Sequence, residues 1–164
     1  MAVPALLSPS REATLEIGAV LGAAATPGAF IALDGVLGAG KTQLVKGIAL
    51  GLGIECWQGL RSPTFTLMQT YRGGRLPLNH MDFYRLSDSP DLPGEMLEAM
   101  HASGEVTVAE WADIWRAHWP RRFVHVRMEV AGETSRRLLM DDPTGLMPGL
   151  PAALAKFADP GGAP

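Results

Sequence analysis

The sequence predicts an α/β fold in which a central, mostly parallel sheet carries helices on both faces and an added antiparallel hairpin. Two observations support this prediction. Nearly continuous apolar runs at 29–33 and within 105–111 are separated by helical patterns, as expected for parallel strands that are covered on both faces. Further along, 123–130 alternates between apolar and polar residues, turns at 131–134 and returns at 136–140, which is typical of an antiparallel hairpin.

Length and composition predict one domain. A chain of 164 residues, of which 47% are hydrophobic, is long enough to bury a real core and too short to favour a second domain. We expect the domain to occupy residues 1–141. Proline, glycine and alanine dominate 142–164, apart from a short helical pattern at 154–157, and this composition predicts a loosely ordered C-terminal tail.

Charge and cysteine content exclude several classes of protein. A formal net charge of −3 argues against a broad basic face that grips nucleic acid directly, so any contact with RNA is expected through partners. The one cysteine, Cys56, cannot form an intramolecular disulfide, and no Cys/His cluster indicates structural zinc. The sequence has no basic signal-type N-terminus and no apolar run of membrane-spanning length, so we expect a cytoplasmic protein without membrane contact.

The chain opens with a helix, a strand and a second helix. Ser8 or Ser10 can cap a helix that runs to about Ala25, and Pro4 to Pro9 is expected to be a frayed lead-in. A buried strand at 29–34 and a helix at 41–52 follow. The patterns after these predict a loop, two strands joined by a glycine turn, a helix, a buried strand and a helical segment. In order, these elements are 61–66, 67–72, 76–86, 94–102, 105–111 and 112–118.

Phosphate binding is predicted by a P-loop at 35–42, which reads Gly-Val-Leu-Gly-Ala-Gly-Lys-Thr and lies between the strand and the helix that such a loop requires. Its glycines allow successive backbone N–H groups to point at a polyphosphate, and the helix adds its positive N-terminal end. Lys41 is expected to reach the β- and γ-phosphates, and the Thr42 hydroxyl to hold Mg²⁺. A glycine-rich turn without a ligand is the structural alternative. The residues predicted to contact nucleotide in this stretch are Gly35, Leu37, Gly38, Ala39, Gly40, Lys41, Thr42 and Gln43.

Two acids lie in or near the end of predicted strands. Asp82 lies in the strand at 76–86, and Glu110 ends the strand at 105–111. An acid at a strand end can orient Mg²⁺ through its water shell or position the attacking water, so we predict that Lys41, Asp82 and Glu110 are catalytic and that both acids are metal-linked with Thr42. An acid also falls at a strand end by chance. His80 is expected to pack or to hydrogen-bond locally, and Trp111 either packs in the core or borders the site.

Four ordered motifs resemble the bacterial TsaE (YjeE) ATPases, which take part in making threonylcarbamoyladenosine in tRNA. The motifs are the P-loop, Ser62-Pro63-Thr64-Phe65, His80-Met81-Asp82-Phe83-Tyr84-Arg85-Leu86 and Glu110-Trp111. The stretch 13–18 is also similar to the opening helix of that family, so the resemblance covers roughly Ser10 to Met140. Val36 departs from the family, which usually has an acidic residue there. Its side chain is not expected to touch phosphate.

The resemblance implies a P-loop ATPase that binds ATP or ADP with Mg²⁺. Thr42 and Glu110 would be near the metal, Asp82 would take the Walker B role, and Trp111 would lie beside the site. Thr64 would lie in a switch-like loop, and Thr14, Arg136 and Arg137 would approach the nucleotide. The implied partners are the proteins of the threonylcarbamoyl transferase complex, of the TsaD and TsaB type, and tRNA would be contacted indirectly through that complex.

Three other classes share the P-loop. A small-molecule or nucleotide kinase needs an acceptor pocket and usually has an arginine-rich lid. Arg116, Arg121 and Arg122 could be interpreted as such a lid, although a solvated helix end and strand start explain them better. A GTPase is disfavoured because the sequence has no Asn-Lys-x-Asp motif. A nucleotide-binding scaffold would not hydrolyse at all. Because no obvious arginine finger lies near the P-loop, we expect slow turnover without partner proteins.

Overall fold

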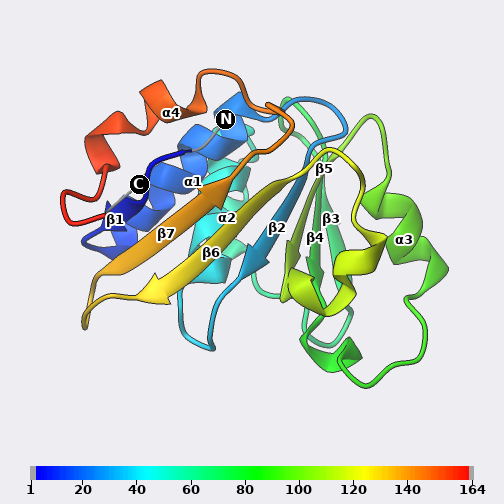
Figure 1. Cartoon of the computed structure of the whole chain (residues 1–164). Helices are drawn as coiled ribbons and strands as arrows, with labels where there is room; N and C mark the ends of the chain where they lie inside the picture. Colours follow the sequence, from blue (N-terminus) through cyan, green and yellow to red (C-terminus); the bar gives the residue numbers. More distant parts are fainter. Residues whose placement is uncertain (1–2, 163–164) are drawn as a thin grey trace.

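One seven-stranded sheet runs through the part of the chain that the computed structural model describes, residues 3–162 (Figure 1). The strands lie in the order β1-β7-β6-β2-β5-β4-β3. Their bounds, in that spatial order, are Leu6–Ser8, Arg136–Asp141, Val124–Val130, Phe30–Asp34, Val106–Glu110, Leu78–Asp82 and Met68–Tyr71.

The centre of the sheet is parallel and its flanks are antiparallel. β2 pairs in parallel with β5 on one side and β6 on the other, and β5 pairs in parallel with β4. The pairs β3–β4, β6–β7 and β1–β7 are antiparallel. This arrangement confirms the predicted α/β fold, the mostly parallel sheet and the added hairpin of β6 and β7.

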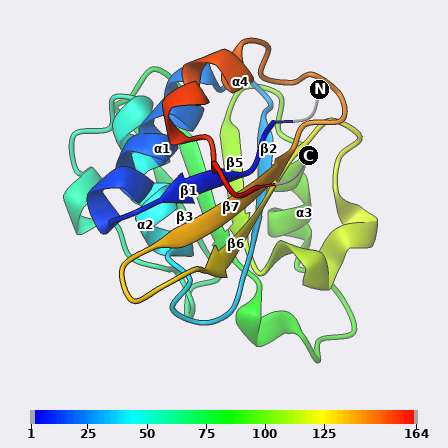
Figure 2. The same cartoon turned by 60° about the vertical axis from the view of Figure 1, so that its left-hand side comes forward.

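Helices cover both faces of the sheet (Figure 2). Because side chains alternate along a strand, β2 sends Ile31 and Leu33 into a core beneath α1 (Arg11–Ala24) and α2 (Lys41–Gly51). Phe30 and Ala32 point to the opposite face, where they pack in a second core with α3 (Gly94–Met100) and η3, a 3₁₀ segment at Ala112–His118. Two further 3₁₀ segments are η1 (Trp57–Gly59) and η2 (Tyr84–Leu86).

Glycines bring α1 and α2 into unusually close contact. A Cβ atom added at Gly18 would lie 2.3 Å from the Leu44 carbonyl oxygen, and one added at Gly47 would lie 2.2 Å from the Leu15 carbonyl oxygen. Gly22 lies against Gly51 in the next turn, so the two helices run in the same direction. Their N-terminal ends therefore lie on the same side of the molecule. The predicted cap is confirmed there, because the Ser10 side chain accepts a hydrogen bond from the Ala13 N–H at 3.1 Å.

The C-terminal segment corrects the prediction of a loosely ordered tail. It forms α4 (Leu150–Ala153) and η4 (Ala155–Phe157), and Arg137 on β7 pairs with Asp159 at 2.7 Å. Its apolar side chains pack into the core shared with α1. The proline and glycine content of the segment alone does not predict this packing. These side chains are Leu146, Met147, Leu150, Leu154 and Phe157.

The N-terminal residues also differ from the expected frayed lead-in. Leu6–Ser8 form β1, which pairs with β7, and Leu6 bridges to Ala158 of the C-terminal segment. A three-residue strand is too short to show a periodic pattern in the sequence. Among residues 3–162, no helix has the length and apolar character needed to cross a membrane.

Candidate functional site

The P-loop lies between β2 and α2, as the sequence predicts. Gly38 and Gly40 adopt positive φ angles of 78° and 99°, which a residue with a side chain rarely tolerates. Gly40 is the N-cap of α2 and provides no side chain, so the first backbone N–H groups of the helix stay open to a ligand. This geometry provides an anion-binding helix start.

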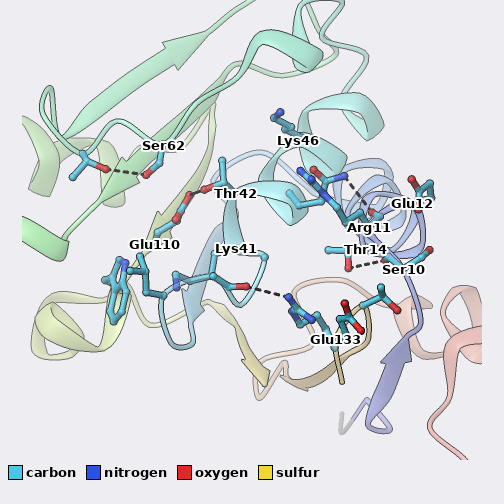
Figure 3. A pocket seen from close by; sticks show the side chains of 18 residues that line it. Ser10, Arg11, Glu12, Thr14, Lys41, Thr42, Lys46, Ser62, Glu110 and Glu133 are labelled. Atoms are coloured by element: carbon cyan, nitrogen blue, oxygen red, sulfur yellow. Dashed lines mark hydrogen bonds between the residues drawn. The ribbon is translucent and has the colours of Figure 1, made fainter. Parts of the chain in front are cut away.

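A cavity of about 690 Å³ opens over this helix start. Figure 3 shows Lys41 and Thr42 on the same side of the cavity as Glu110, with Ser10 and Thr14 from the start of α1 facing them. Most of the predicted nucleotide-binding residues line this cavity. They are Thr14, Leu37, Gly38, Gly40, Lys41, Thr42, Gln43, Thr64, Trp111 and Arg136, together with the acid Glu110.

Lys41 is held at the floor of the cavity, where only 5% of the residue is exposed. Its Nζ donates hydrogen bonds to the carbonyl oxygens of Gly35, at 2.6 Å, and Val36, at 3.1 Å. The same atom lies 4.1 Å from the centre of the Trp111 ring, a cation–π contact. Burial lowers the pKa of Lys41, and the nearby carboxylates of Glu110 and Asp82 oppose this shift. The arrangement aims a poorly hydrated positive charge at the cavity.

Trp111 packs against its neighbours and also lines the cavity, so the two interpretations of this residue, core packing and a place beside the site, are compatible. Its ring lies 5.0 Å from the ring of Tyr84. Its backbone has a φ of 57°, a left-handed conformation that is uncommon for a bulky residue. This turn directly follows Glu110 and directs the indole back over Lys41.

Glu110 contacts the P-loop directly. It lies at the end of β5, next to β2 in the sheet, and its Oε1 accepts a hydrogen bond from the Thr42 hydroxyl at 3.0 Å. The same oxygen lies 2.8 Å from Nε2 of His80, which comes from β4. A buried carboxylate is therefore held against the threonine that was predicted to bind Mg²⁺.

Asp82 has different partners and does not line the cavity. Its Oδ2 accepts hydrogen bonds from the hydroxyls of Ser62 and Thr64, the latter at 3.0 Å, and its Oδ1 accepts one from the Tyr84 N–H at 2.9 Å. Asp82 thus holds the loop that precedes β3. The acid bonded to the P-loop threonine is Glu110.

The two neighbouring arginines of β7 point in opposite directions. Arg136 lines the cavity and donates to the P-loop carbonyl oxygens of Ala39, at 3.0 Å, and Gly38, at 3.2 Å. Arg137 pairs with Asp159 and does not line the cavity, so this contact does not support the prediction that it approaches the nucleotide. The alternation of side chains along a strand explains why only one of two adjacent residues can face the site.

Of the other predicted residues, Gly35 and Ala39 lie in the P-loop without lining the cavity, although both carbonyl oxygens are hydrogen-bonded to site side chains. Sequence reasoning missed several residues that do line it. The Ser10 cap identifies the start of α1, but only the close helix contact shows that this end reaches the P-loop. The missed residues are Ser10, Arg11, Glu12, Lys46, Ser62, Glu133 and Thr134.

The residues fit a magnesium–nucleotide pair. Open N–H groups at a helix start and the Lys41 ammonium suit phosphate, and Mg²⁺ prefers oxygen ligands of the kind that Thr42 and Glu110 provide. A hydroxyl and a carboxylate already joined at 3.0 Å provide such oxygens without rearrangement of the backbone.

Comparisons with known proteins agree with these features. The family model described as "Threonylcarbamoyl adenosine biosynthesis protein TsaE" matches residues 8–138. This chain belongs to the TsaE family. The resemblance inferred from four sequence motifs is thereby confirmed.

The chain is similar to curated TsaE proteins over most of its length. It is 39% identical to the tRNA threonylcarbamoyladenosine biosynthesis protein TsaE of Bacillus subtilis (strain 168) over 127 residues, which cover 77% of this chain and 78% of the relative. The protein of the same name from Treponema pallidum is 38% identical over 135 residues, covering 80% of this chain and 96% of the relative. A crystal structure of Bacillus subtilis YdiB matches with a TM-score of 0.74 and 29% identity, covering 97% of this chain and 99% of that one.

Proposed function

We propose that this TsaE-family chain binds and hydrolyses ATP with Mg²⁺ in support of the threonylcarbamoyladenosine modification of tRNA next to the anticodon. It would act with the threonylcarbamoyl transferase complex, through proteins of the TsaD and TsaB type, and would contact tRNA only through them. The role in tRNA modification is supported by the family model and by the names of the relatives.

The hydrogen bond between Thr42 and Glu110 is the observation that carries the proposed chemistry. It joins the P-loop helix to a buried carboxylate, beside a lysine whose ammonium already lies among P-loop carbonyl oxygens. A glycine-rich turn without a ligand would need neither the buried lysine nor the buried acid, because burying charged groups is costly. This cost supports a functional site.

The residues of the site have distinct roles in the proposed reaction. Lys41 and the N–H groups at the start of α2 bind and orient the phosphates, and Glu110 holds the Thr42 hydroxyl in place. Asp82 accepts a hydrogen bond from the Thr64 hydroxyl and so fixes the loop that carries it, and Thr64 lines the cavity in which the terminal phosphate would bind. Bound Mg²⁺ supplies neutralisation of the charge on the phosphate oxygens.

The need for partners is supported by how the cavity arginine is used. Arg136 donates to carbonyl oxygens of the P-loop and also to those of Gly132 and Ser135, so it braces the loop and is not free to act as an arginine finger. A finger supplied by a partner contributes on the order of 10³ to 10⁵ in rate to related reactions. Exposed apolar residues at the P-loop and the Thr64 loop, Leu37 at 82% and Phe65 at 84%, are consistent with a docking partner.

Phosphate release by the isolated chain and by the chain with purified transferase partners tests the proposal, with ATP and GTP compared in both cases. We expect slow hydrolysis of ATP that partners accelerate, and no activity in Glu110→Gln with partners present. Fast release by the chain alone, unaffected by partners, would instead favour the kinase alternative with a leaking acceptor site. Absence of nucleotide binding under all conditions would contradict the proposal.

A further inference from the structure

His80 has no role in the chemistry described so far, yet it lies among the most buried residues of the site, with an exposed fraction of 0%. It belongs to β4, where the alternation of side chains places it on the same face of the sheet as Asp82. The pairing of β4 with β5 sets Asp82 opposite Glu110 and His80 opposite Val108. His80 and Glu110 are therefore diagonal neighbours on one face of two paired strands, close enough for side-chain contact.

The hydrogen bonds of His80 are one-sided. Its Nε2 lies 2.8 Å from Oε1 of Glu110, whereas its Nδ1 is buried and has no hydrogen-bond partner among the described residues. An ionised carboxylate only accepts hydrogen bonds, so in a contact with ionised Glu110 the donor is Nε2. An unprotonated Nδ1 is then left as a bare acceptor, which is a smaller penalty than an orphaned N–H group. Glu110 thus sets the tautomer of the imidazole.

The oxygen that His80 contacts is also the one that Thr42 contacts. Oε1 of Glu110 accepts both bonds, from Nε2 of His80 and from the Thr42 hydroxyl at 3.0 Å. Among the hydrogen bonds of residues 3–162, those made by the Glu110 carboxylate converge on Oε1, and none is made by Oε2. A glutamate side chain has three rotatable bonds, and two donors converging on one oxygen restrict them.

We infer that His80 is a positioning residue that holds the carboxylate of Glu110 in the rotamer that meets Thr42 and the metal-binding end of α2. Partners of this kind, which touch a ligand-bearing carboxylate without touching the metal, commonly change metal affinity by 10- to 100-fold when removed. The inference rests on the proposed binding of magnesium and nucleotide at this site. It assigns His80 no contact with nucleotide.

Two variants separate positioning from packing. His80→Leu removes the donor and keeps an apolar side chain of similar size, whereas His80→Gln places an amide N–H at a comparable distance from the backbone. A matched control is His125→Leu on β6. His125 is also a buried histidine that bonds a carboxylate through Nε2, at 2.9 Å from Asp34, but its partner Asp34, unlike Glu110, does not line the cavity. Thermal melting of all three variants identifies any loss of fold.

The decisive measurement is the Mg²⁺ dependence of ADP binding, followed by calorimetry in the full chain. We expect His80→Leu to raise about 10-fold the Mg²⁺ concentration at which the increase in ADP affinity is half of its maximum. His80→Gln should recover part of this change, and His125→Leu should leave it near the parental value. In a Glu110→Gln background His80→Leu should have no further effect, because the residue it positions is already altered.

A second measurement needs no nucleotide. Long-range ¹H–¹⁵N correlation of the imidazole signals should report a protonated Nε2 and an unprotonated Nδ1 for His80, and Glu110→Gln should shift these signals without moving those of His125. Parental Mg²⁺ dependence in His80→Leu, or full additivity with Glu110→Gln, would overturn the inference while leaving the proposed function intact. If the parental chain shows no Mg²⁺-dependent binding at all, the proposed function fails first, and His80 is then a packing residue only.

Discussion

Substitution of Gly47 by alanine tests whether the close contact between α1 and α2 builds the site. The added Cβ would lie 2.2 Å from the Leu15 carbonyl oxygen and 2.8 Å from the Cα atom of Gly18, both inside the 3.0 Å that real Cβ contacts essentially never cross. Both neighbours are backbone, so no side chain can rotate away and the helices must separate. Overpacking of this kind costs about 1–3 kcal/mol, and the better helix propensity of alanine returns about 1 kcal/mol.

We therefore expect Gly47→Ala to lower the free energy of unfolding by up to about 2 kcal/mol, which corresponds to a melting temperature lower by up to roughly 8 °C for a domain of this size. Nucleotide affinity should fall as well, because separation of the helices moves Ser10 and Thr14 away from the P-loop. The control is Gly94→Ala at the start of α3, where an added Cβ meets nothing within 4 Å. Denaturant unfolding and calorimetry measure both effects. If Gly47→Ala were as stable as Gly94→Ala, with unchanged affinity, the tight helix contact would not shape the cavity.

Three further predictions concern the charged residues. Lys41→Ala should weaken ATP binding by about 1.5–3 kcal/mol, because it removes a charged donor to phosphate. Calorimetric titration measures this loss, and unchanged affinity together with unchanged turnover would refute the P-loop assignment. Glu110→Gln should alter the Mg²⁺ dependence of nucleotide binding, because Glu110 bonds the P-loop threonine. Asp82→Asn should spare nucleotide binding, lower turnover and increase hydrogen exchange around Thr64, which Asp82 bonds. Identical behaviour of the two variants would contradict these separate contacts. Burial lowers the pKa of Lys41 in the folded chain below its ordinary value of 10.5. At pH values between the lowered pKa and 10.5, the unfolded chain therefore binds more protons than the folded chain, and the stability of the nucleotide-free protein should rise with pH over this range. Lys41→Met should lose this rise in pH-dependent melting curves, and an unchanged slope would show that the lysine is not desolvated.

Much of the fold follows from the sequence because its central elements have strong patterns. The strand predicted at 29–34 is observed at Phe30–Asp34, and the helix predicted at 41–52 is observed at Lys41–Gly51. Strands buried on both faces are nearly continuous in apolar residues, so a run of apolar residues is enough to locate them in the sequence. The strand predicted at 76–86 is shorter, Leu78–Asp82, because the chain turns into a 3₁₀ segment at Tyr84.

The parts that sequence reasoning missed depend on contacts between distant segments. The C-terminal stretch is dominated by proline, glycine and alanine, and its large apolar side chains are buried because they meet the core shared with α1. The partner of His80 is set by the register of β4 against β5, which no local pattern encodes. The alternation of β4 could have placed His80 on the same face as Asp82, and the same rule could have separated Arg136 from Arg137.

The order of strands explains why the two acids have different partners although both end parallel strands. β5 lies between β2 and β4, so Glu110 is one strand spacing, about 4.8 Å, from the strand that leads into the P-loop, and Asp82 is two spacings away. At one spacing a glutamate reaches Thr42, and at two an aspartate reaches the loop before β3 instead. In the sequence Asp82 comes first and lies nearer to the P-loop, so proximity along the chain suggests the opposite assignment. The strand crossover therefore decides which acid meets the P-loop, and β4, which carries both Asp82 and His80, connects the Thr64 loop to Glu110.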